Sequence, residues 1–269
     1  MPGVIFAQTL RRNWRQAIYW GVGIALLGMY IIILVPNVDM LQQYAQLMES
    51  IPPLLIQAFG VSDASEVATP EGFLAFGYFS YIMLVMATYG VMAGMNVTAN
   101  EEDRGIMDML LSTPVVRWRV VLEKLVAYLL IIVGIVAVSF VGLWIGALAT
   151  PGLGLDAGKL LIGSINLLPA TFTVLAFTIF VGALMRNRGT ALALAAVFVV
   201  AAYFIDFLGN AASESAAAAL RAISFYSYYG GADIMKTGLN WGNVAVLIAA
   251  GIVLVAAGAW LFQRRDIGT

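Results

Sequence analysis

The sequence predicts an all-α integral membrane protein in which one transmembrane domain, residues 1–269, contains six transmembrane helices. Two observations predict this class. Hydrophobic residues make up 62% of the chain and charged residues 11%, and the mean hydropathy is +0.92, far outside the range of soluble globular proteins. The apolar residues are also concentrated in six long runs, each about long enough to cross a bilayer.

The N-terminal stretch, residues 1–15, is predicted to form an interfacial helix because it combines apolar side chains with three arginines, Arg11, Arg12 and Arg15. The first span follows at about residues 17–35 and contains no charge. This apolar run is too long for a cleavable signal peptide and ends without a small-x-small cleavage pattern, so we expect a retained span.

The other five spans are predicted at about residues 73–97, 125–149, 160–184, 190–208 and 243–262. Short external helices are expected after the first and fifth spans. The segment 36–72 has five acidic residues and no Lys or Arg, which places it on the non-cytoplasmic side. The segment 209–242 contains an aromatic cluster that suits the depth of a membrane interface: Phe225, Tyr226, Tyr228 and Tyr229.

The basic residues predict the orientation. With these spans, eleven of the 14 Lys and Arg residues fall on one side of the membrane. Because Lys and Arg are enriched in cytoplasmic loops, both termini and the segment 98–124 are expected in the cytoplasm. We therefore expect a multi-pass protein of the cell (inner or plasma) membrane.

The longest strongly charged segment runs from Asn100 to Lys124. Ile106, Met109 and Leu110 recur at i, i+3 and i+4 among charged residues, which predicts a short amphipathic helix. Pro114 ends that helix and starts a second one, which continues into the third span. The pattern predicts a cytosolic rod, a hinge and a span, so that a push on the rod would move the span. A solvated connector between two spans is the alternative interpretation.

Several function classes are disfavoured by what the chain lacks. It has no Cys and no His, so thiol chemistry, Ser-His catalysis and His-containing metal sites are excluded, and we predict no catalytic residue and no metal site. The predicted midplanes of the spans contain no ionisable residue, which argues against ion-coupled transport. The run Gly158-Lys159-Leu160 does not have the spacing of a Walker A loop, so no cofactor is expected in this chain.

The run from Glu101 to Pro114, followed by Arg117 and Lys124, resembles the cytosolic segment between the second and third spans of ABC-2 type exporter permeases. Ile106, Asp108 and Glu123 depart from the Thr, Glu and Gly that are usual there. The ending at residues 263–267 is also similar to the C-terminus of that family. The resemblance implies a permease subunit that couples ATP hydrolysis on a separate chain to export, and that is not itself an enzyme.

The same resemblance implies the partners. They are two copies of a cytosolic ABC ATPase that holds ATP and Mg, a second permease (an identical chain or a close paralogue) and the lipid bilayer, with no nucleic acid. The implied ATPase-coupling residues are Glu101, Glu102, Arg104, Gly105, Asp108, Leu111, Pro114 and Arg117, with Arg186 and Arg188 as a second contact. The substrate-binding residues are not indicated.

Two other hypotheses belong to different classes. An intramembrane aspartyl protease would use Asp156 and Asp206, although both lie near the predicted outer edge and the spacing around Asp156 departs from the Gly-x-Gly-Asp pattern. A membrane scaffold without transport activity would bind a partner that has no nucleotide site.

Overall fold

The computed structural model describes residues 3–35, 37–61, 63–99, 116–185, 187–211 and 219–264. These residues form helices joined by short connections, without a strand among them. Six helical stretches of the described chain are long and apolar enough to cross a membrane: α2 (Arg15–Leu34), α5 to α6 (Pro70–Val97), α9 (Arg117–Ala149), α10 (Ala157–Leu184), α11 (Arg188–Ala211) and α15 (Trp241–Arg264). The predicted all-helical, six-span fold class is confirmed.

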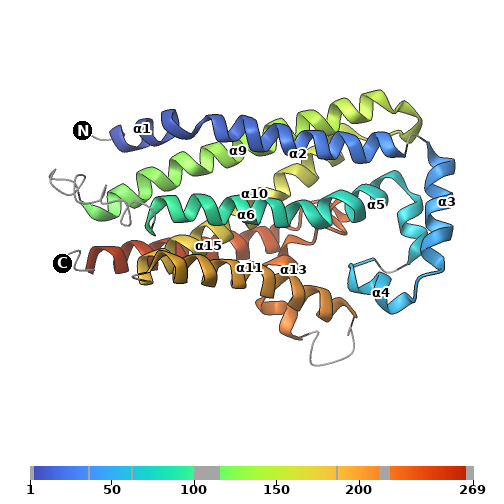
Figure 1. Cartoon of the computed structure of the whole chain (residues 1–269). Coiled ribbons are helices and arrows are strands. Elements are labelled where there is room, and N and C mark those ends of the chain that lie inside the picture. The colour runs from blue at the N-terminus through green and yellow to red at the C-terminus, as the bar shows by residue number, and fades with distance from the viewer. Residues whose placement is uncertain are drawn as a thin grey trace.

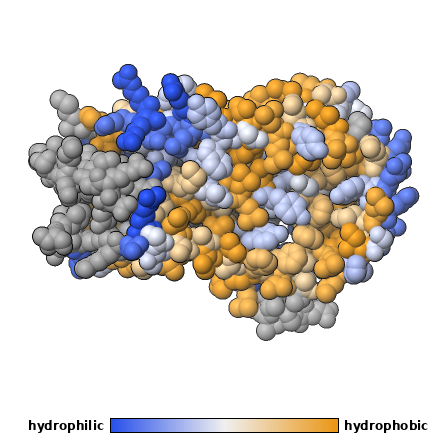
Figure 2. All heavy atoms as spheres, in the orientation of Figure 1, coloured by the Kyte–Doolittle hydropathy of each residue, from blue (hydrophilic) through white to orange (hydrophobic). Residues whose placement is uncertain are grey.

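The six spans run side by side, and the two ends of the chain lie at the same end of the molecule (Figure 1). We call this the inner end, because it is the end predicted to be cytoplasmic. Figure 2 shows a broad hydrophobic surface between more hydrophilic ends, as expected for a molecule surrounded by lipid.

Helix α9 is much longer than the predicted third span. Its 33 residues measure about 50 Å, against about 30 Å for the apolar core of a bilayer. The helix continues into the apolar run without a break, as the sequence predicts for the second helix of the charged segment. It begins at Arg117 and not at Pro114, because the backbone of Val116 is extended. The inner end of α9 is therefore one rigid element with the span.

Helix α1 (Val4–Asn13) packs on the inner end of α9. The first turn of α1 contains no acidic residue of its own. Glu123 of α9 supplies the missing negative charge. Its carboxylate accepts hydrogen bonds from the backbone N–H groups of Gly3 (3.1 Å), Ile5 (3.1 Å) and Phe6 (3.2 Å). Arg119 donates to the same carboxylate over 2.9 Å. We call this arrangement the Glu123 clamp.

Glycines allow two close helix contacts at positions where the sequence shows small-xxx-small pairs. Gly142 and Gly146 of α9 face α2, and a Cβ atom on Gly142 would lie 2.6 Å from the Cα atom of Ala25. Gly90 and Gly94 of α6 (Ser80–Val97) face α10 in the same way, and a Cβ atom on Gly94 would lie 2.5 Å from the Cβ atom of Thr178. Close approach of backbones is the usual means of packing helices within lipid.

Helix α10 is the centre of the bundle and contacts α6, α9, α11 and α15. The helices at the edge of the bundle are much less buried. Within the chain, 28% of the most apolar stretch of α2 is buried, and 22% of that of α11 and of α15. Their exposed apolar faces are the surfaces that lipid or a second chain covers.

The opposite end, which we call the outer end, carries the short helices α3 (Val38–Glu49) and α4 (Pro53–Ala58) and the 3₁₀ helix η1 (Ala64–Ala68). The span that follows starts at Pro70 in α5 (Pro70–Leu74), with the side chain of Thr69 as its N-cap. Between α11 and α15 lie η4 (Arg221–Ile223), α13 (Phe225–Tyr229) and α14 (Ile234–Thr237).

The three basic residues predicted on the outer side each pair with an acid from another part of the chain. Lys159 lies 2.9 Å from Glu71, Arg221 lies 3.0 Å from Asp206, and Lys236 pairs with Glu66. The first pair joins the starts of α10 and α5, the second joins α11 to η4, and the third joins α14 to η1.

Candidate functional site

The predicted ATPase-coupling residues fall mostly outside the described part of the chain: Glu101, Glu102, Arg104, Gly105, Asp108, Leu111, Pro114 and Arg186. Two others are described. Arg117 is the first residue of α9 and Arg188 is the first residue of α11. Both helices start at the inner end, where α6 finishes (Figure 1). The role of these residues in coupling stays a prediction.

A pocket at the outer end is the site that the structure does describe in detail. It has a volume of about 410 Å³ and is bounded by four segments that are far apart in sequence. These are the end of α4 with its following turn, the first turn of α6, the last two turns of α11, and the connection from Arg221 to Asp233. We call it the outer pocket.

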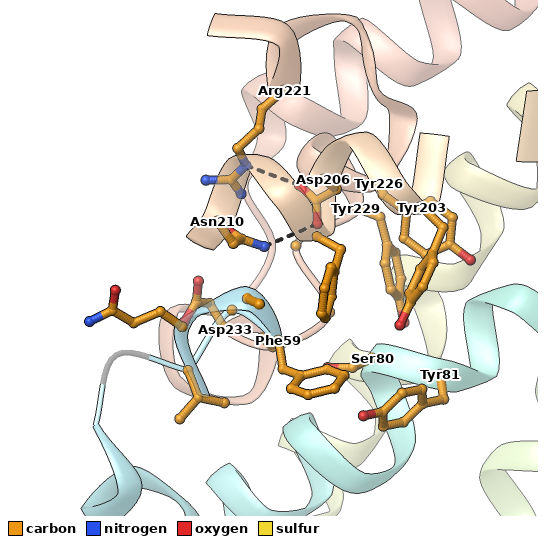
Figure 3. Close-up of a pocket in the computed structure, with 18 residues that line it drawn as sticks. Phe59, Ser80, Tyr81, Tyr203, Asp206, Asn210, Arg221, Tyr226, Tyr229 and Asp233 are labelled. Carbon is orange, nitrogen blue, oxygen red and sulfur yellow. Dashed lines mark hydrogen bonds and ion pairs between the residues drawn. The ribbon is translucent and has the colours of Figure 1, made fainter. Parts of the chain in front are cut away.

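One side of the outer pocket is polar. The guanidinium of Arg221 donates through Nε to Asp206 over 3.0 Å, and the amide of Asn210 donates to the same carboxylate over 3.3 Å. Figure 3 shows these three side chains together at one edge of the cavity. The sequence places Asp206 near the outer interface, and its partner comes from a connection whose path only the structure reveals.

The rest of the wall is largely aromatic. Phe59 meets the ring of Phe207 edge-on at a centroid distance of 5.0 Å and lies 6.3 Å from the ring of Tyr81. Tyr203 stands edge-on to Tyr226 at 5.5 Å. In Figure 3, Phe59 and Tyr81 lie across the cavity from Tyr203 and Tyr226. Aromatic walls with a few convergent polar groups are typical of small-molecule sites.

The aromatic cluster between α11 and α15 is more buried within the protein than the sequence suggests. Phe225, Tyr226 and Tyr229 are 4%, 5% and 2% exposed, so they pack inside the protein and do not lie at a membrane interface. Ser224 attaches the start of α13 to α11. Its hydroxyl donates to the carbonyl of Ala202 over 2.7 Å and accepts from the N–H of Tyr226. The interpretation as an interfacial cluster is therefore wrong for these three rings.

Tyr226 lines the outer pocket, and its hydroxyl lacks a hydrogen-bond partner among the described residues. Its hydroxyl is buried, and the described part of the chain offers it no hydrogen-bond partner. Burial raises the pKa of this tyrosine far above its ordinary value, so the hydroxyl remains protonated. Tyr229, by contrast, donates to the carbonyl of Phe79 over 2.8 Å. An unpaired buried hydroxyl costs free energy.

The backbone next to the outer pocket departs from a regular helix. One turn of π-helix, η2 (Ala75–Phe79), precedes α6, and the hydroxyl of Ser80 donates to the carbonyl of Ala75 over 2.9 Å. Gly231 lies against this turn, since a Cβ atom there would lie 2.9 Å from the carbonyl oxygen of Phe79. Single π-helical turns often mark functional sites.

The two aspartates of the protease hypothesis belong to different helices and have different hydrogen-bond partners. Asp156 caps α10 by accepting the N–H of Lys159 over 2.9 Å, and Asp206 is held by Arg221 and Asn210. Within the described residues, no group of three or more Asp, Glu, His or Cys side chains could hold a metal ion. Of the two aspartates of that hypothesis, only Asp206 lines the outer pocket.

The family model described as ABC-2 family transporter protein matches residues 5–267, nearly the whole chain. None of the curated proteins matches.

Proposed function

The chain belongs to the ABC-2 transporter family, and we propose that it is the membrane-spanning permease subunit of an ATP-driven exporter. The observation that carries the proposal is the family match over residues 5–267 on a chain with six candidate spans. Proteins of this family are transport subunits and not the ATPase itself. We place ATP and Mg on a separate cytosolic ATPase, present in two copies, and pair the chain with a second permease, identical or closely related.

The inner end suggests how force enters the spans. The segment 100–115 joins α6 to α9, so a movement of that segment acts on the start of α9 at Arg117. Helix α9 continues unbroken into the membrane and packs on α2 and α10. The Glu123 clamp attaches α1 to the same rigid element. A push from the ATPase would therefore move α9 and α1 together, as a rigid-body switch requires.

A comparison of charge-reversal variants tests this proposal. The variant Glu101→Lys, Glu102→Lys, Asp108→Lys should lose the ATPase when the tagged protein is purified in mild detergent from its own host. The reversed charges of the predicted rod would then be repelled by the surface of the ATPase that binds its acidic side chains. The matched control reverses three acids of the outer segment: Asp39, Glu49 and Asp63. It carries the same change in net charge and should retain the ATPase.

Thermal melting of both variants in detergent shows whether they remain folded. Retention of the ATPase by a folded variant with all three inner charges reversed would overturn the coupling proposal. A partner that lacks a nucleotide site in every preparation would favour the membrane scaffold.

A further inference from the structure

The outer pocket has the size and position of a ligand site. Its volume of about 410 Å³ lies within the usual range for small-molecule sites, about 300–1,000 Å³. The lining includes external segments, Gln57–Val61 and Gly230–Asp233, together with residues well inside the second span, Ser80 and Tyr81. A molecule from the outer side or from the outer leaflet would meet this site before the core of the bundle.

The charges around the outer pocket favour a cation. Its lining contains two carboxylates, Asp206 and Asp233, and one guanidinium, that of Arg221, which leaves one excess negative charge when all are ionised. Arg221 is neutralised by Asp206 at 3.0 Å, so an anion would gain little from it and would be repelled by Asp233. The nearby pair of Glu66 and Lys236 adds no net charge.

The aromatic wall favours a particular kind of cation. Six aromatic residues line the cavity: Phe59, Tyr81, Tyr203, Phe207, Tyr226 and Tyr229. Aromatic rings attract cations through the negative charge of their faces, and they also bury apolar groups. A compact, strongly hydrated metal ion would use neither property, whereas an organic cation with an apolar body would use both.

The hydroxyl of Tyr226 supplies the remaining feature, a hydrogen-bonding atom without a partner inside the wall. A neutral phenol oxygen accepts a hydrogen bond from an N–H group of a ligand. From these three observations we propose that the outer pocket binds a small organic cation, an amine or aromatic ammonium compound with an apolar body. That this ligand is exported rests on the proposed function, but the binding itself does not.

The experiment measures binding of ethidium, an organic cation with amino groups, to the full chain in nanodiscs of zwitterionic phosphatidylcholine without any ATPase. Tyr226→Phe removes only the hydroxyl, which has no described partner, so the fold loses no described hydrogen bond. We expect about tenfold weaker binding, the effect of one hydrogen bond to a charged group at the low end of its range.

The matched control is Tyr228→Phe on the same helix. The Tyr228 hydroxyl donates to the carbonyl of Ala222 over 2.8 Å and does not line the outer pocket, so this variant should bind ethidium as the parent does. Equal binding by the Tyr226→Phe variant, or no binding by the parent, would overturn the proposal. Equal or tighter binding of the anionic dye anilinonaphthalene sulfonate would overturn the assignment of a cation.

The dependence on pH tests the charge argument separately. Partial burial raises the pKa of Asp233, and of the charges that face it the Lys236 and Arg221 cations lower that pKa while Glu66 raises it. A carboxyl with a raised pKa attracts a cation above that pKa and loses the attraction as the pH falls through it. Ethidium binding should thus weaken as the pH falls, beginning above the pH at which an ordinary aspartate is protonated. Binding that is constant from neutral pH into the acidic range would contradict the charge argument.

Because the assay contains no ATPase, its result is independent of the proposed function. A chain that binds ethidium but never associates with an ATPase would retain the site and lose the exporter proposal. A chain that associates with an ATPase but does not bind ethidium would retain the exporter proposal and overturn the proposed cation site.

Discussion

The Glu123 clamp makes a sharp prediction for the variant Glu123→Gln. The carboxylate accepts two hydrogen bonds at each oxygen: Gly3 N–H and Arg119 Nε at Oε1, and the N–H groups of Ile5 and Phe6 at Oε2. An amide has the same shape, but one of its two polar atoms is an NH₂ group that only donates. Whichever way the amide turns, two of the four accepted hydrogen bonds are lost.

The magnitude follows from the kind of hydrogen bond. Each bond to a charged group contributes about 1.5–3 kcal/mol, and a negative charge at a helix N-terminus adds about 0.3–1 kcal/mol. Glu123 is near the surface, with a side chain 14% exposed, so water can replace part of what is lost. We expect the contact between α1 and α9 to weaken by about 2 kcal/mol, which corresponds to about a 30-fold larger population of detached α1.

Hydrogen–deuterium exchange of the full chain in nanodiscs measures this population. Amides of α1, such as that of Ala7, which donates to the carbonyl of Gly3 over 2.9 Å, should exchange about 30-fold faster, by the same arithmetic. Amides in the buried part of α10 should not change. The matched control Glu49→Gln alters an exposed acid at the end of α3 and should leave α1 unaffected. Unchanged exchange in α1 of the Glu123→Gln variant would refute the clamp.

Two further predictions concern stability in detergent, measured by thermal melting. Gly142→Ala should destabilise the protein by about 2 kcal/mol, because the added Cβ atom would meet the backbone of Ala25, whereas Gly23→Ala, where a Cβ atom meets nothing within 4 Å, should be neutral or slightly stabilising. Equal melting temperatures would show that α2 and α9 are not in backbone contact. Lys159→Gln should lower the melting temperature only slightly, because Lys159 is exposed and water replaces its ion pair with Glu71. A large fall in the melting temperature would mean that this pair is needed to hold the start of α10 against α5.

The six spans could be predicted because each is a long apolar run, and such runs have few alternatives to crossing a bilayer. Their ends were less predictable. The helix that continues into the third span was expected to start at Pro114, yet α9 begins at Arg117, where the backbone of the preceding Val116 is extended. The sequence does show Glu123 as a departure from the residue usual in the family. Only the structure shows why a carboxylate is there, since its partners lie about 120 residues earlier in the chain.

The outer pocket could not be predicted from local patterns. Its walls come from segments as distant as Phe59 and Tyr226, and nothing in the spacing of either segment indicates the other. The available signals were single residues: Asp206 as a carboxylate near a span, and the aromatic run after the fifth span. The same residues would suit a membrane interface equally well, so the choice between surface and interior depended on the tertiary contacts of Ser224.

Native mass spectrometry of the tagged chain, purified in mild detergent from its own host, can show whether an ATPase drives this permease. We expect one complex that contains two six-span permease chains, this one with a mass of 28.8 kDa, and two copies of a cytosolic subunit with a Walker A loop. Release of the ATPase subunits by the charge-reversal variant at Glu101, Glu102 and Asp108 should follow in the same spectra. A chain that appears alone, or with a partner that has no nucleotide site, would contradict the claim that ATP drives this permease.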